Sequence, residues 1–320
     1  MREQYILLHT MILWPAYVVI TAHASSPMQR LELAMNQVCH SFHGRIGYYV
    51  KNLKTGETIG LHEGDRFPSA STIKTAIMIE VVNQVLAGKL KWSEKIKVPP
   101  KNQRSPSMWT AYLEEGTALN IDGLTNLMMN VSDNTAAVML ADRVGVENIE
   151  RRMLSWGLRD TACTIHEPAT NARLRDLQRQ FANMGVTSPK DMGGLLERLY
   201  RRTAAENPAA SERMLRVMSH QYWDDFFTSQ IPPGAYVCSK VGALNRSRSD
   251  TAIVFGQTPY IITAYTDDAA DQSWSDHCEG HDTLRALSKL AWQHLEPNHP
   301  YSAPKDADKW FPTGAGVEDS

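Results

Sequence analysis

The chain has 320 residues, a formal net charge of −2 and an apolar fraction of 42%. This is a globular composition, long enough for one large hydrophobic core or two smaller ones. There is no basic excess that would indicate nucleic-acid binding and no acidic run that would indicate a solvated tail.

Residues 1–24 have the pattern of a cleavable secretory signal. Arg2 gives a positive start, residues 5–20 are almost wholly apolar, and a small-x-small cleavage site ends at Ala24. An uncleaved anchor is the alternative, although Pro15 and the short apolar run argue against it. We therefore expect a periplasmic or secreted protein with no stable membrane association after cleavage.

Apolar periodicity predicts a helix-rich middle between two parts that carry strands. Helices are expected at 29–40, 72–86, 135–144, 189–200 and 283–294, and strands at 46–50, 58–62, 235–240, 251–256 and 260–266. Because the strands are short and turns separate them, an antiparallel meander fits better than crossovers.

The expected fold is therefore α+β with two lobes. Residues 25–66 and 218–296 form an α/β domain, an antiparallel sheet flanked by N- and C-terminal helices, and residues 67–217 form an inserted all-α domain. The seam between the domains is the expected place for a binding cleft. Residues 297–320 are rich in Pro, Gly and Asp and are expected to be a flexible tail.

The chain has four cysteines, at positions 39, 163, 238 and 278, and their spacing matches no zinc pattern. Export would permit disulfides, and Cys39 and Cys278 flank the first and last helices. A bridge between them and buried free thiols are both open.

Ser71-Thr72-Ile73-Lys74 is the first segment that indicates chemistry. Ser71 would open a helix with Lys74 one turn later on the same face. A serine hydroxyl needs a proton acceptor within hydrogen-bond reach, and a helix start offers N–H groups where an oxyanion forms. An N-cap serine beside a surface lysine is the alternative.

Ser132-Asp133-Asn134 is the second segment. The Ser132 hydroxyl can pass a proton to a leaving nitrogen, and the Asn134 amide can hold a substrate carbonyl. Asp133 is expected to brace the turn through backbone hydrogen bonds. A loop that ends in an N-cap is the alternative.

Ser239-Lys240-Val241-Gly242-Ala243, on a predicted strand, is the third segment. Lys240 would bring positive charge to an anionic substrate, and Gly242 would let a ligand lie close to the strand edge. A protective lysine on an edge strand is the alternative.

Glu167 and Asn171, four residues apart in a predicted tight loop, are the fourth signal. A carboxylate and an amide at this spacing could hold one water between them and supply the base for hydrolysis. A surface turn is the alternative, because Glu-Pro is common in turns.

In this order and at these separations, the four segments resemble the motif set of class A β-lactamases and penicillin-binding proteins. The resemblance covers residues 29–296, including the turn at Ile231-Pro232-Pro233-Gly234 ahead of the Lys240 strand. It implies a two-lobed serine β-lactamase-like fold with the site between the lobes. It also implies a small-molecule β-lactam or peptidoglycan-like substrate, no nucleic acid and a monomer.

The resemblance further implies roles for single residues. Ser71 attacks the lactam carbonyl, and either Lys74 or Glu167 acting through water takes its proton. Backbone N–H groups of Ser71 and Ala243 form the oxyanion hole. Ser132 protonates the lactam nitrogen, and Glu167 with Asn171 activates the deacylating water.

Three positions depart from the family pattern. Val241 stands where the family has Thr or Ser, whose hydroxyl helps hold the substrate carboxylate; Arg246 or, better placed, Arg248 is expected to compensate as a substrate-binding residue. Ile165 and Ala162 replace arginines that the family often has just ahead of the loop glutamate, so the usual salt bridge of this loop is expected to be absent. Either Arg104 or Trp109 is expected at the cleft mouth.

His277, Cys278, Glu279, His281 and Asp282 form a possible metal-binding cluster. A polar helix start explains the same residues, and the serine mechanism needs neither metal nor cofactor, so none is predicted. Two alternatives to β-lactam hydrolysis stay open: a D-alanyl-D-alanine peptidase or another serine acyl hydrolase, and a non-catalytic penicillin-binding sensor.

Overall fold

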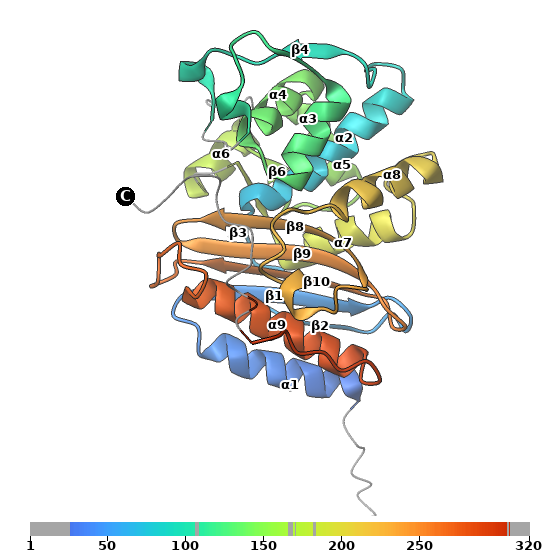
Figure 1. Ribbon diagram of the computed structural model, residues 1–320, viewed down its shortest axis with the longest axis vertical. Coiled ribbons are helices and arrows are strands. Elements are labelled where there is room, and N and C mark those ends of the chain that lie inside the picture. The colour runs from blue at the N-terminus through green and yellow to red at the C-terminus, as the bar shows by residue number, and fades with distance from the viewer. Residues whose placement is uncertain are drawn as a thin grey trace, which may run out of the picture.

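The computed structural model describes residues 26–105, 109–165, 169, 171–181, 184–305 and 307. A layer of two helices, a five-stranded sheet and a helical lobe follow one another along the long axis of the molecule (Figure 1). The N- and C-terminal parts of the chain build the sheet, and the middle builds the helical lobe. This is the α+β architecture expected from the sequence.

The helices are α1 (Pro27–His40), α2 (Lys74–Leu86), α3 (Ile121–Asn130), α4 (Asn134–Val144), α5 (Val146–Ser155), α6 (Ala172–Gln180), α7 (Pro189–Tyr200), α8 (Pro208–Met218) and α9 (Glu279–Leu295). Short 3-10 turns are η1 (Ala70–Ile73), η2 (Lys101–Gln103), η3 (Thr110–Tyr112) and η4 (Thr228–Gln230). The strands are β1 (Arg45–Asn52), β2 (Thr58–Leu61), β3 (Phe67–Pro68), β4 (Lys95–Lys97), β5 (Ala118–Asn120), β6 (Ala162–Cys163), β7 (Gly185–Thr187), β8 (Tyr236–Leu244), β9 (Ser247–Phe255) and β10 (Tyr260–Asp267).

The main sheet has the strand order β2-β1-β10-β9-β8, and its neighbouring strands are antiparallel. The expected meander of the last three strands is therefore present, and β8 runs four residues beyond its predicted end. β8 is an outer strand, so one of its edges has no strand partner.

Helices α1 and α9 cover one face of the sheet (Figure 1). A capping box fixes the start of α1: the Ser26 side chain accepts from the Gln29 amide, and the Gln29 side chain accepts from the Ser26 amide. Apolar residues at helical spacing, Leu31 and Met35 among them, are buried against the sheet.

Helix α7 packs on the opposite face of the sheet, against β1 and β10. Its Gly193 allows this close approach, because an added Cβ would lie 2.5 Å from the Tyr49 ring. The sequence reading placed 189–200 within the all-α domain of residues 67–217, whereas this helix is also a covering layer of the sheet. The apolar periodicity of this segment predicts a buried face but not the lobe against which that face packs.

All four cysteines are free and buried. The proposed bridge between Cys39 and Cys278 is therefore wrong, and the alternative of buried thiols holds. Burial raises the pKa of the Cys39 thiol to about 12, so it stays protonated and behaves as a small apolar side chain.

Within the described residues, no helix is both long enough and apolar enough to cross a lipid bilayer. The predicted signal at residues 1–24 lies outside the described part. Of the expected tail, residues 297–305 are described and form neither helix nor strand, residue 307 lies on a 3-10 turn, and the remaining residues lie outside.

Candidate active site

The Ser71 hydroxyl lies on the turn η1, directly before α2, and not on the first turn of the helix itself. Two anchors hold this turn: the Ser69 amide donates to Gly185 O at 2.9 Å, and Thr72 Oγ1 lies 3.0 Å from Tyr265 Oη on β10. Ala70 has φ +45°, a left-handed conformation that is unfavourable for a residue with a Cβ. Such backbone strain persists only where the surroundings impose it.

Lys74 is the first residue of α2 and is completely buried. Its Nζ lies 3.0 Å from Ser71 Oγ, as the sequence pattern predicted. It also lies 2.6 Å from both Ser132 O and Asn134 Oδ1, and 3.1 Å from Ser132 Oγ. The first two sequence segments therefore meet at one amine.

Burial holds the pKa of Lys74 well below its usual range, and the nearby positive charge of Lys240 lowers it further. A neutral amine has two hydrogens and one lone pair. The hydrogens match the two oxygens at 2.6 Å, which can only accept, and the lone pair can then face the Ser71 hydroxyl at 3.0 Å or the Ser132 hydroxyl at 3.1 Å. This geometry suits a general base for Ser71.

Ser132 lies between the two lysines, and the next residue, Asp133, holds the turn that carries it. Asp133 is buried, caps α4 by accepting from the Ala136 amide, and accepts from the amide and hydroxyl of Thr110. It therefore braces the turn as expected. Ser132 itself has φ +60°, a second left-handed residue at the site. Asn134 directs Oδ1 to Lys74, which fixes the orientation of its amide.

Lys240 reaches the same point from β8. Its Nζ is 3.1 Å from Ser132 Oγ and 3.0 Å from Val241 O, and the side chain is buried. Burial lowers the pKa of Lys240 to about 7, although the nearby Asp250 opposes the shift. The third segment thus joins the first two at the Ser132 hydroxyl.

Gly242 lies in close contact with the turn η1. A Cβ added there would lie 2.9 Å from Ala70 Cβ and 3.0 Å from Ser69 O, so the missing side chain lets the turn η1 approach β8. The sequence instead predicts that the missing side chain of Gly242 leaves room for a ligand along the strand edge. Ala243 follows on the outer strand, half-buried, which is compatible with its predicted place in the oxyanion hole.

Arg248 is not placed as a substrate-binding residue. It is 3% exposed, and its guanidinium donates to the carbonyls of Leu244, Ser247 and Ser273 and to His281. All its nitrogens therefore bond within the protein, and the prediction that Arg248 grips the substrate is corrected. Arg246, the other candidate, is exposed and paired with Asp268. Val241 packs into the apolar cluster beneath α9.

The fourth segment is described only in part, because Glu167 lies outside the described residues. Asn171 caps α6: its Oδ1 accepts from the Leu174 amide at 2.9 Å. Its Nδ2 donates to Glu150 Oε2 at 2.6 Å. The predicted water-holding role of Asn171 thus stays a prediction, and Glu150 is a partner that no sequence motif marked.

Of the two candidates for the cleft mouth, Trp109 lies next to the site. Its amide is 3.3 Å from the Asp133 carboxylate, and its side chain is 46% exposed. Arg104 instead donates to carbonyls of its own loop, including those of Pro99 and Leu113.

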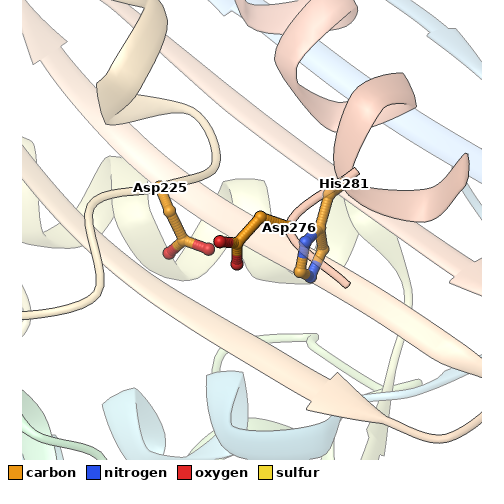
Figure 2. Close-up of side chains that lie close together, drawn as sticks. All are labelled: Asp225, Asp276 and His281. Atoms are coloured by element: carbon orange, nitrogen blue, oxygen red, sulfur yellow. The ribbon is translucent and has the colours of Figure 1, made fainter. Parts of the chain in front are cut away.

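A cluster that could suggest a metal site lies beside the N-terminal end of α9. Figure 2 shows Asp225, Asp276 and His281, whose ligand atoms lie within 4.8 Å of one another. His281 Nε2 faces the Arg248 Nε–H at 2.9 Å and must accept. A neutral imidazole has a single lone pair, so Nδ1 carries the proton and cannot bind a cation. These residues therefore do not fit a metal ion.

A serine hydroxyl beside a buried lysine amine, with a second serine and a second lysine opposite, defines the class of a serine hydrolase in which lysine partners the nucleophile. The chain matches the family model of the beta-lactamase enzyme family over residues 30–295. It therefore belongs to that family, within its class A branch.

Curated relatives are distant but cover most of the chain. Beta-lactamase CARB-3 of Pseudomonas aeruginosa is 25% identical over 249 residues, which are 76% of this chain and 83% of that protein. Beta-lactamase SME-1 of Serratia marcescens is 22% identical over 262 residues, which are 80% of this chain and 85% of that protein.

Solved structures agree in fold. A beta-lactamase from Sphaerobacter thermophilus DSM 20745 has a TM-score of 0.73 at 21% identity and covers 84% of this chain and 99% of its own. The structure of PBP-A has a TM-score of 0.73 at 22% identity and covers 87% and 100%. At these identities the likeness shows the fold alone.

Proposed function

We propose that this protein is a serine β-lactamase that opens the lactam amide through an acyl-enzyme on Ser71. The observation that carries the proposal is the position of the buried Lys74 amine, 3.0 Å from the Ser71 hydroxyl and 2.6 Å from two oxygens that can accept its hydrogens. Family membership narrows the expected substrate to a cyclic amide.

Acylation follows from this geometry. Ser71 Oγ attacks the lactam carbonyl while Lys74 Nζ takes the hydroxyl proton. The oxyanion lies between the amides of Ser71 and Ala243. Ser132 Oγ, 3.1 Å from each lysine amine, then passes its proton to the lactam nitrogen as the C–N bond breaks, and takes in exchange the proton that Lys74 Nζ removed from Ser71.

Deacylation completes the cycle. Glu167 takes a proton from a water that attacks the ester carbonyl of the acyl-enzyme, and Asn171 helps to hold this water. The ester C–O bond breaks, and Ser71 Oγ takes up the proton that Glu167 removed from the water, which restores both groups. This step separates a hydrolase from a protein that remains acylated.

The test combines a chromogenic cephalosporin with intact-mass measurement of the purified protein. We expect continuous hydrolysis by the unaltered chain, none by Ser71→Ala, and an accumulating adduct on Ser71 in Glu167→Ala. Normal turnover by Glu167→Ala would remove Glu167 from the mechanism, and turnover by Ser71→Ala would remove the acyl-enzyme.

A second candidate is a penicillin-binding protein that acylates and then stops, or a D-alanyl-D-alanine peptidase on the same scaffold. The observation that favours it is Asn171, whose amide and oxygen both bond within the protein. A single stoichiometric adduct on the unaltered chain with no further hydrolysis would support this candidate over the first.

A further inference from the structure

A buried carboxylate lies against the start of α6. Glu150 on α5 is 7% exposed, and each of its oxygens accepts a hydrogen bond from the start of α6. Oε2 accepts from Asn171 Nδ2 and Oε1 from Arg173 Nη1, both at 2.6 Å. Arg173 also donates to Arg159 O at 2.7 Å. Glu150 therefore ties α6 to α5.

The hydrogen-bond partners fix the orientation of the Asn171 amide. A carboxylate only accepts and a backbone N–H only donates, so Nδ2 must face Glu150 and Oδ1 must face Leu174. Charge-assisted bonds of this length are the stronger kind. The Leu174 amide therefore fixes which end of the Asn171 side chain faces the helix start, and Glu150 holds the other end.

The contact with Glu150 takes the place of a salt bridge that the sequence lacks. The loop before α6 has Ile165 in place of the arginine that commonly forms its internal salt bridge, and Glu150 supplies an anchor from a neighbouring helix instead. Asn171 follows Glu167 by four residues, so the anchor acts at the C-terminal end of the segment that carries the predicted base.

We propose that Glu150 is a positioning residue for hydrolysis of the acyl-enzyme: together with the Leu174 amide it fixes the side chain of Asn171, and through Arg173 it holds the start of α6. This inference rests on the proposed β-lactamase function. It assigns Glu150 no contact with substrate. Acylation at Ser71, which depends on Lys74 and Ser132, is independent of it.

The test measures acylation and deacylation separately, by stopped-flow with a chromogenic cephalosporin and by the lifetime of the Ser71 adduct in intact-mass spectra. Glu150→Gln leaves one acceptor oxygen for two donors, Asn171 Nδ2 and Arg173 Nη1, and should slow deacylation roughly tenfold or more, while acylation stays within about threefold of the unaltered chain. Glu147→Gln, on the exposed side of the same helix, is the matched control and should change neither rate.

A rescue keeps the test sharp if Glu150→Gln folds poorly. Asn171→Asp places two carboxylates against each other, whereas Asn171→Asp combined with Glu150→Gln restores a donor and an acceptor. We expect the double variant to deacylate faster than either single variant.

Equal slowing of both rates, unchanged deacylation in Glu150→Gln, or a double variant no faster than the single ones would overturn the role of Glu150. Absence of turnover in the unaltered chain would instead overturn the proposed function, and the inference with it.

Discussion

Gly242 offers the most direct test of how the nucleophile is held in place. In Gly242→Ala, the new Cβ would lie 2.9 Å from Ala70 Cβ, 3.0 Å from Ser69 O and 2.6 Å from Ser249 Oγ. The Ser249 hydroxyl can rotate away, but Ala70 Cβ and Ser69 O belong to the strained turn and can move only with the backbone. Relief to ordinary contact at about 3.5 Å therefore requires a separation of roughly 0.5 Å between β8 and η1.

Such overpacking should lower the free energy of unfolding by about 1–3 kcal/mol. It should reduce kcat/KM for acylation by up to roughly 10²-fold, because Ser71 moves relative to Lys240 and the Ala243 amide. Urea denaturation measures the first quantity, and single-turnover acylation with a chromogenic cephalosporin measures the second.

Gly234→Ala is the matched control, because it lies in the turn before the same strand and its added Cβ would meet no atom within 4 Å. It should change neither quantity. If Gly242→Ala acylated and unfolded like the unaltered chain, β8 and the nucleophile turn would not be in the tight contact described above.

Three further predictions follow from buried polar groups. Arg248→Met should lower the free energy of unfolding by about 2–4 kcal/mol, because it leaves buried carbonyl acceptors unpaired, and should leave KM for a β-lactam nearly unchanged. Arg246→Met removes only an exposed ion pair and should change the free energy of unfolding by no more than about 0.5 kcal/mol. A large rise in KM for Arg248→Met would restore its substrate-binding role. Asp133→Asn should lower the free energy of unfolding, measured in urea, by about 2–3 kcal/mol, because one of the two oxygens that accept from the backbone N–H and the hydroxyl of Thr110 becomes an NH2 group. An unchanged free energy of unfolding would show that Asp133 does not brace the turn. The rate of acylation should rise with pH through a pKa of Lys74 well below 10.5; Lys240→Met should move that rise to higher pH, since the lost positive charge no longer favours the neutral amine, and a shift to lower pH would contradict this assignment.

The sequence predicted the acylation machinery because its residues carry their own chemistry at fixed local spacing. Ser71 and Lys74 are one helical turn apart, and their partners Ser132 and Lys240 lie in equally recognisable short motifs. Their convergence was predicted from the resemblance of these motifs to a known family, because periodicity gives the helices and strands but not which of them meet. The five-stranded sheet and its flanking helices were accessible for the same reason.

The roles that the sequence could not supply depend on what packs behind a residue. Arg248 carries the positive charge that a substrate carboxylate would need, but its guanidinium donates hydrogen bonds to hairpin carbonyls and to His281 instead. Gly242 accommodates the nucleophile turn, which is far away along the chain. Glu150 is one of several acidic residues on an amphipathic helix, and only the packing of α5 against the start of α6 shows that it is buried.

The two half-reactions therefore have separate supports. The amine of Lys74 is held by α2 and the Ser132 turn, so the groups that acylate Ser71 lie within one hydrogen-bonded cluster. Asn171 is held by α5 through Glu150, outside that cluster. We therefore predict that loss of the Glu150 contact slows release of the adduct from Ser71 and leaves its formation unchanged.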